Sequence, residues 1–336
     1  MQSTTIDRLS TRQISIDTIR DAATVVYDTV VRTPLVRLPI DPGGPEVYLK
    51  LETLQPIGSF KIRGACYAVR RVPADDLADG VWTVSAGNAA QGVALAARGA
   101  GVPCQVLVMD TAPETKLAAI QRFGATIVKA PYDECWRAVE QHRSDRMPGR
   151  LVHPFDDDDF ISGNGTMALE IVEDLPDVDA VIAPLGGGGL LAGVGIGLKA
   201  LRPDVTIYAA EPETAAPLSV SLAAGAARRF EAWQPSFVDG AGGKSVLGTM
   251  WPLLSDLVSD SLVVKLSDAA AAMRLVADRL HVIAEGAAAC AVAAATSAAM
   301  AERGHRKIVA IVSGGNIDLA RFAQIVGACG NRPAAQ

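Results

Sequence analysis

Lys61 stands in a sequence environment that suits a reactive amine better than a surface charge. It follows a segment, 56–60, that contains proline, glycine and an aromatic residue, and it opens a run of apolar side chains at helical spacing. These are Ile62, Ala65, Ala68 and Val69. A lysine that is partly removed from water loses its proton more readily, as Schiff-base formation requires. On this segment alone, an ordinary lysine at a helix start remains an equally good interpretation.

Four consecutive glycines join a short apolar strand at 181–183 to a helical run. They are Gly186, Gly187, Gly188 and Gly189. Such a turn leaves backbone N–H groups pointing outward beside a helix N-terminus, which is a binding place for phosphate. No lysine-serine pair follows the glycines, so the segment is not a nucleotide P-loop.

The glycine segment has two other interpretations. Gly187, Gly189 and Ala192, followed by a strand at 206–210 and then Glu211, match the spacing of a dinucleotide fingerprint with its ribose-binding acid. A plain strand-to-helix turn would need no ligand at all.

Two further segments put small polar residues at the carboxyl end of an expected strand, where ligands of open α/β sheets bind. One follows the strand 81–84 and the other follows the strand 307–312. The first contains Ser85, Ala86, Gly87, Asn88 and Ala89, and the second contains Ser313, Gly314, Gly315 and Asn316. Each alone is weak, because such residues often only cap helices.

Together and in this order, the four segments resemble the fold-type II family of pyridoxal-phosphate enzymes, and within it the serine/threonine dehydratases and the related serine racemases. The resemblance runs from about Thr33 to Leu319 and includes further motifs. These are Phe155-Asp156-Asp157, Gly163-Asn164-Gly165-Thr166, Ala210-Glu211-Pro212, Asp239-Gly240 and Glu285-Gly286-Ala287.

The expected fold is α/β, with mostly parallel sheets covered by helices. Alternation of short β-rich runs with Ala/Leu-rich helical runs predicts this independently of any relative. Seven runs are expected to form strands: 47–51, 81–84, 105–109, 126–129, 181–183, 206–210 and 308–312. The resemblance adds a two-domain plan. A large cofactor-binding domain would comprise residues 1–79 and 150–330, a small domain, 80–149, would be inserted into it, and 331–336 would form a tail.

The resemblance implies that the cofactor is pyridoxal 5'-phosphate and that the partner is a small amino-acid substrate. Lys61 would bind the cofactor as a Schiff base and later act as the base at the substrate Cα. Phe60 and Gly240 would cover the two faces of the pyridine ring, and Asn88 would bond its 3-oxygen. The phosphate would be held by Gly186, Gly187, Gly188 and Gly189.

The remaining implied roles concern the substrate and the ring nitrogen. Ser85, Gly87, Asn88 and Ala89 would bind the substrate. Ser313 would face the pyridine nitrogen, with a helix N-cap as its alternative role. A neutral hydroxyl there does not keep the nitrogen protonated, so a carbanion is short-lived and expulsion of a β-leaving group is favoured.

The expected activity is therefore a lyase reaction in amino-acid metabolism. L-Threonine, L-serine or a related β-hydroxy amino acid would be converted to a 2-oxo acid and ammonia by β-elimination. A serine racemase or a β-replacement enzyme of the same fold is the alternative, and a dinucleotide-dependent oxidoreductase is a distant one.

Three positions depart from the relatives. Ala86 stands where racemases carry a proton-donating serine, which favours dehydration. Pro217 stands where the racemase-type cation site has its second carboxylate, so we expect no metal and expect Glu211 only to cap a strand. Ala89 stands where many dehydratases carry histidine, so the substrate pocket is expected to differ.

Bulk properties agree with an enzyme that acts on small molecules. The 336 residues carry a net charge of −6 with no basic block, which argues against nucleic acid, and 49% of them are hydrophobic. The Ala-rich stretch 284–300 is expected to be a buried helix rather than a membrane span. We expect a cytoplasmic protein, because the N-terminus lacks the pattern of a signal peptide, and a homo-oligomer, a dimer. The chain is expected to lack the C-terminal regulatory domain of biosynthetic threonine dehydratases.

The cysteines and histidines are expected to be structural. Cys66, Cys104, Cys135, Cys290 and Cys329 show no close pairing, which suits reduced thiols in the core. The four scattered histidines form no helical ligand pair, so no zinc site is expected. The acidic run 156–159 is expected to be a solvated turn.

Overall fold

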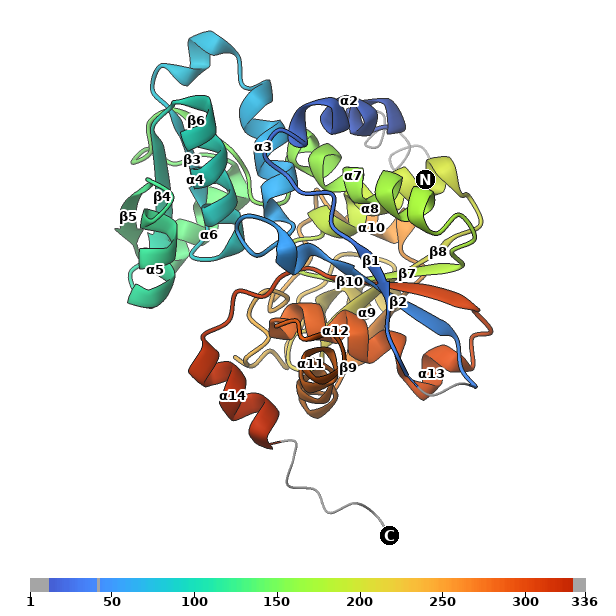
Figure 1. The fold of residues 1–336 in the computed structure, drawn as a ribbon. Helices are drawn as coiled ribbons and strands as arrows, with labels where there is room; N and C mark the ends of the chain where they lie inside the picture. The colour runs from blue at the N-terminus through green and yellow to red at the C-terminus, as the bar shows by residue number, and fades with distance from the viewer. Residues whose placement is uncertain (1–11, 41–42, 329–336) are drawn as a thin grey trace.

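The computed structural model describes residues 12–40 and 43–328, and its strands form two separate sheets (Figure 1). The six-stranded sheet has the order β1 (Leu35–Arg37), β2 (Glu46–Leu51), β10 (Lys307–Val312), β7 (Ala180–Pro184), β8 (Thr206–Pro212) and β9 (Asp260–Val264). Within it, all neighbours are parallel except β1 and β2. The four-stranded sheet is wholly parallel, in the order β5 (Thr126–Ala130), β4 (Cys104–Met109), β3 (Val81–Val84) and β6 (Arg150–Leu151).

Helices cover both faces of the six-stranded sheet, as buried parallel strands require. On one side lie α2 (Ile16–Val26), α7 (Asp158–Asp174), α8 (Gly189–Leu201) and α10 (Trp251–Leu257) (Figure 1). On the other side lie α11 (Leu266–Leu280), α12 (Gly286–Ala295), α13 (Ala298–Ala301) and α14 (Leu319–Ala328). A further helix, α9 (Pro217–Ala224), packs beside β8 and β9.

The four-stranded sheet and its helices form the small-sheet unit, which lies to one side of the molecule (Figure 1). Its helices are α4 (Asn88–Ala100), α5 (Glu114–Gln121) and α6 (Tyr132–Gln141). It is joined to the larger part through α3 (Lys61–Arg71), which packs against both α4 and α7. The short 3-10 turns η1 (Glu52–Leu54) and η2 (Ala74–Leu77) flank α3 in the chain.

The expected α/β class is confirmed, and all seven expected strands are present within two residues at each end. Three short strands, β1, β6 and β9, had no sequence prediction. They have three, two and five residues, which leaves little length for a period-two pattern to stand out.

Two expectations about local segments have different outcomes. The Ala-rich stretch forms the wholly buried α12, which ends before the short α13, and no described helix is long and apolar enough to cross a bilayer. The acidic run is not a solvated turn, because Asp156 is buried and accepts hydrogen bonds from Arg12, Thr249 and His142. These hydrogen bonds outweigh the opposing effect of burial and lower the pKa of Asp156.

Candidate functional site

The start of α3 and the end of β10 meet at one edge of the six-stranded sheet. The backbone N–H of Phe60 donates to the carbonyl of Ser313 over 3.0 Å, and Ser59 forms a bridge with Gly314. These contacts place Lys61, the first residue of α3, beside the residues that leave β10. The glycine segment leaves the neighbouring strand β7 at the same edge, because both strands are parallel.

The glycine segment is closed against its neighbours so tightly that side chains are excluded. A Cβ on Gly187 would lie 2.1 Å from the Phe155 ring, and one on Gly189 would lie 2.5 Å from the Phe155 carbonyl. Gly188 has φ of +94°, which favours glycine, and α8 begins at the next residue. Backbone without side chains therefore follows β7 and leads into the N-terminus of α8, as a phosphate-binding turn requires.

Lys61 is held with its amine between aromatic rings. Its Nζ donates to the Pro154 carbonyl over 2.6 Å and lies 5.1 Å from the Phe60 ring centroid and 5.3 Å from that of Phe160. Burial lowers the pKa of Lys61 to about 8, although the carboxyl of Glu285 opposes the shift. An amine with this pKa is partly neutral near pH 7, so it can act as a nucleophile or a base.

The helix that carries Lys61 is anchored by a buried ion network under Arg63. Arg63 is fully buried and pairs with Glu52 at 2.8 Å and with Glu170 at 2.6 Å. Lys50 also pairs with Glu170, at 2.5 Å, so two cations face two carboxylates. Removing one partner would leave a buried charge uncompensated, which typically costs about 3–5 kcal/mol. The network therefore fixes the first turn of α3.

Asn88 joins the small-sheet unit to the larger part of the molecule. Its Nδ2 donates to Glu285 Oε1 over 2.9 Å, and its Oδ1 accepts from Asn316 Nδ2 over 2.7 Å. One amide hydrogen of Asn88 remains for a ligand. Asn88 thus lies where the small-sheet unit meets the larger part of the molecule.

Glu285 belongs to this site although sequence reasoning gave it no role. It is 6% exposed, and its Oε1 lies 2.8 Å from the Cβ position of Gly314 and 3.4 Å from that of Gly240. Burial, and then the charge of Asp239, raise the pKa of Glu285 to about 8. The motif at 285–287 could have drawn attention to it, but only the fold brings it to Asn88.

The segment that follows β3 offers backbone donors at the start of α4. The Ser85 hydroxyl accepts from the Gly87 N–H over 3.1 Å, so the hydroxyl proton of Ser85 remains available for donation. Gly87 is the N-cap of α4, and the first N–H groups of a helix have no partner within it. Asn88 and Ala89 are in this first turn, where a carboxylate is favoured.

Gly240 lies against the glycine segment. Its carbonyl is 2.8 Å from the Cβ position of Gly186. Asp239 beside it forms an ion pair with Lys116 of α5 in the small-sheet unit. The expected site residues from four distant segments are thus brought together, with Gly240 added from a fifth.

Glu211 is used inside the protein rather than at the cleft. It lies in β8, and its carboxylate accepts from the N–H groups of Leu218 and Ser219 and from the Ser261 hydroxyl, at 2.9, 2.8 and 2.5 Å. It therefore caps the N-terminus of α9, where Pro217 is the first residue, and not a strand as expected. Within 12–40 and 43–328, no group of three or more His, Cys, Asp or Glu side chains is placed to hold a metal ion.

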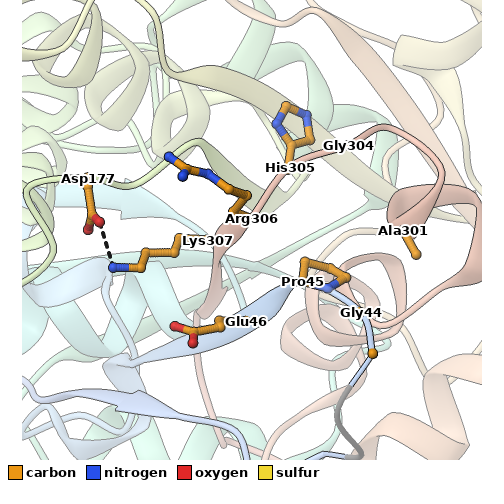
Figure 2. A pocket seen from close by; sticks show the side chains of 10 residues that line it. Gly44, Pro45, Glu46, Asp177, Ala301, Gly304, His305, Arg306 and Lys307 are labelled. Carbon is orange, nitrogen blue, oxygen red and sulfur yellow. Dashed lines mark hydrogen bonds and ion pairs between the residues drawn. The ribbon is translucent and has the colours of Figure 1, made fainter.

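A cavity lies at the opposite end of the six-stranded sheet from the candidate site (Figure 2). It is lined at the starts of β2 and β10, where Lys307 is paired with Asp177 at 2.6 Å. Lys61 and the glycine segment follow the other ends of these parallel strands, so this cavity is separate from the candidate site.

The four cysteines that the structure describes, Cys66, Cys104, Cys135 and Cys290, are buried free thiols, as expected, and Cys329 lies outside the described residues. Burial raises the pKa of each of the four, which makes them unreactive. The candidate site therefore depends on Lys61 as its nucleophile.

Comparison with known proteins agrees with this geometry. Residues 26–314 match the family model described as pyridoxal-phosphate dependent enzyme. An L-threonine ammonia-lyase of Thermotoga maritima is 35% identical over 93% of this chain and 78% of its own length. A human serine racemase is 37% identical over 91% of this chain and 92% of its own. A maize serine racemase structure superimposes with a TM-score of 0.85 at 32% identity, covering 94% of this chain and 97% of its own.

The family model covers all the segments that form the site except the residues after 314. It also excludes the dinucleotide interpretation of Gly187, Gly189 and Ala192, because the matching family binds a different cofactor. In this fold, Gly187 and Gly189 follow β7 and lie against Phe155.

Proposed function

Because the chain belongs to the pyridoxal-phosphate dependent enzymes of fold type II, we propose that it is a dehydratase of β-hydroxy amino acids. It converts L-threonine, L-serine or a related substrate to a 2-oxo acid and ammonia by β-elimination. The observation that carries the proposal is the position of Ser313, a neutral side chain that the backbone bond to Phe60 holds beside Lys61.

The residues present fit pyridoxal 5'-phosphate. The turn from 186 to 189 carries no side chains, and a Cβ at Gly187 or Gly189 would clash with Phe155, so backbone amides rather than side chains would meet a phosphate. Lys61 supplies the amine, with a pKa lowered to about 8 by burial. When bound, the cofactor withdraws electrons from the substrate Cα.

The protein side chains then control protons and positions. Lys61 Nζ takes the proton from the substrate Cα, which its partly neutral state allows. Asn88 would bond the 3-oxygen of the ring, while Glu285 and Asn316 fix the Asn88 amide from the larger part of the fold. Phe60 and Gly240 would lie on the two faces of the ring.

The substrate is held at the start of α4. The hydroxyl of Ser85 and the first-turn backbone of Gly87, Asn88 and Ala89 favour its carboxylate. Alanine at 89 has a smaller side chain than the histidine that many dehydratases carry there. We therefore include larger β-hydroxy amino acids in the proposed substrate class.

Elimination is favoured over racemisation by two side chains. A racemase must return a proton to the face of Cα opposite Lys61, and Ala86 has no proton to give. Ser313 is neutral, so it would not keep the ring nitrogen protonated. A carbanion at the substrate Cα would therefore be short-lived. Both features favour loss of hydroxide from the substrate over return of a proton to its Cα.

Serine racemase is the second candidate, because relatives with that name match over 91% of this chain at 37% identity. A β-replacement reaction would require a second nucleophile. The test is to incubate the purified holoenzyme with threonine, serine, an aryl-serine and 3-hydroxyaspartate and to measure ammonia, 2-oxo acid and D-amino acid. D-serine without ammonia would contradict the dehydratase proposal.

We further propose a large domain of residues 1–79 and 150–330 and an inserted domain of 80–149. The four-stranded sheet supports the inserted domain, although its strand β6 pairs with β3 and reaches Leu151. The expected tail, 331–336, lies outside the described residues. We propose a cytoplasmic homodimer, supported by the buried free thiols and by exposed apolar side chains at Tyr27, Val31 and Leu54.

A further inference from the structure

Lys244 is held between two aromatic rings that belong to different parts of the fold. Its Nζ lies 4.4 Å from the ring centroid of Trp233 and 5.0 Å from that of Tyr132. Trp233 is in the segment between α9 and α10, whereas Tyr132 is the first residue of α6 in the small-sheet unit. A cation over two ring faces is attracted by both, so the lysine links the two parts.

The segment that contains Lys244 is tied to itself as a strap, which we define as residues 229–250. The N–H of Phe230 donates to the Lys244 carbonyl over 2.8 Å, and Trp233 Nε1 donates to the Gly242 carbonyl over 2.9 Å. Arg229 and Ser245 form a β-bridge. These contacts close the chain from 229 to 245 on itself, and this closed part of the strap includes Gly240, Gly242 and Gly243.

The strap reaches the small-sheet unit at three places. The first is the contact of Lys244 with Tyr132, and the second is the ion pair of Asp239 with Lys116. The third is Leu247, which packs against the apolar cluster that includes Trp82, Leu107 and Ala138. Gly240 of the strap lies against Gly186 of the glycine segment, so a shift of the strap would change the proposed cofactor site.

We propose that Lys244 is a positioning residue whose side chain, between Tyr132 and Trp233, holds the strap closed over the cofactor cleft. In the closed position Gly240 lies against Gly186 and near the Glu285 carboxyl. This inference rests on the proposed function only in assigning Gly240 to one face of the cofactor. The contact itself is independent of which substrate is used.

The contacts of the strap with the small-sheet unit are better suited to opening and closing than to stabilising the fold. Tyr132 is 45% exposed, and the ion pair with α5 joins two exposed side chains, so both contacts break at little cost to the core. The strap nevertheless contains Val238, Ala241, Val246 and Met250, which are buried. The exposed contacts at Asp239 and Lys244 can therefore break while these four residues stay anchored in the core.

The test compares two substitutions of Lys244 in the holoenzyme. Lys244→Met keeps the aliphatic stem and removes the charge, whereas Lys244→Arg keeps a cation that can lie over the rings. Lys265→Met, at an exposed lysine, is the charge-matched control. Hydrogen exchange of residues 239–245 and 130–136 is measured together with KM and kcat for the best amino-acid substrate.

We expect Lys244→Met to speed exchange in both segments and to raise KM about fivefold with kcat within about twofold, the size that loss of one exposed cation-aromatic contact allows. Lys244→Arg and Lys265→Met should behave like the unmodified protein. Tyr132→Leu should have the same effect as Lys244→Met. The two substitutions together should add nothing, because both remove the contact between Lys244 and Tyr132.

Unchanged exchange in Lys244→Met would overturn the proposal, as would faster exchange throughout the protein or failure of Lys244→Arg to restore the closed state. Exchange does not depend on turnover. If the unmodified protein released no ammonia from any substrate, the proposed function would fail while the exchange data still decided the role of Lys244.

Discussion

Asn88 Nδ2 donates to Glu285 Oε1 over 2.9 Å, which links the first turn of α4 to the residue that precedes α12. The two residues are 197 positions apart and belong to parts of the fold built on different sheets. Asn316 completes the link by donating to Asn88 Oδ1. The amide proposed to bond the cofactor ring is thus positioned from the opposite side of the cleft, by a carboxyl group with a raised pKa.

Glu285→Gln should stabilise the cofactor-free protein more at about pH 8 than at about pH 5. Burial, and then Asp239, raise the pKa of Glu285 from 4.5 to about 8 in the folded state. The folded protein therefore keeps a proton that the unfolded chain releases, so stability falls as pH rises from 4.5 towards 8. Glutamine does not titrate and escapes this loss. Melting temperatures at both pH values check it, and an equal difference at both would refute it.

Lys61→Ala should abolish turnover and leave the fold intact. The substitution removes both the proposed covalent anchor and the proposed base, and such a loss typically costs several orders of magnitude in rate. Release of 2-oxo acid measures the activity, and circular dichroism checks the fold. Full activity in this variant would refute both the roles given to Lys61 and the proposed function.

Gly187→Ala should reduce retention of the cofactor sharply, because the new Cβ would lie 2.1 Å from the Phe155 ring and would displace the glycine segment. The control is Gly99→Ala in α4, where nothing lies within 4 Å of the added Cβ. Absorbance of the bound cofactor after gel filtration is the measurement. Equal retention in the two variants would remove the phosphate role from this segment.

Ala86→Ser should raise racemisation of serine above that of the unmodified protein. The new hydroxyl would supply a proton on the face of Cα opposite Lys61, so donors would stand on both faces. Chiral analysis of serine after incubation measures the effect, and continued dehydration of L-serine shows that the variant is intact. No gain of D-serine in an active variant would show that the missing donor does not set the outcome.

Ser313→Asp should weaken dehydration more than it weakens retention of the cofactor. The glycine segment and Lys61 provide most of the hold, so losing one ring hydrogen bond, about 0.5–1.5 kcal/mol net, leaves the cofactor bound. A carboxylate beside the ring nitrogen favours protonation of that nitrogen. The carbanion is then more stable, so loss of hydroxide is less favoured. Bound cofactor is followed by absorbance and turnover by 2-oxo acid release. Unchanged turnover at full retention would contradict the proposed role of Ser313.

The sequence alone was sufficient for the local elements of the site. Lys61 opens α3 as its apolar spacing predicts, and the glycines from 186 to 189 end β7 and begin α8. Asn88 begins α4 directly after β3 and its short turn. These features follow from periodicity, chain breakers and strand length, which are local properties of a chain.

The tertiary structure decided which side chains meet and how they ionise. Glu285 carried no local signal for its raised pKa, because the shift depends on burial between segments far apart in the chain. Asp156 is acidic in sequence and lies in a run of four aspartates, yet contacts from Arg12, His142 and Thr249 make it a buried anchor. Glu211 became a helix cap for the same reason, since its partners Ser219 and Ser261 are supplied by other elements. Chain order fixes the neighbours of a residue along the backbone, but desolvation and ion pairing depend on distances that only the packed fold sets.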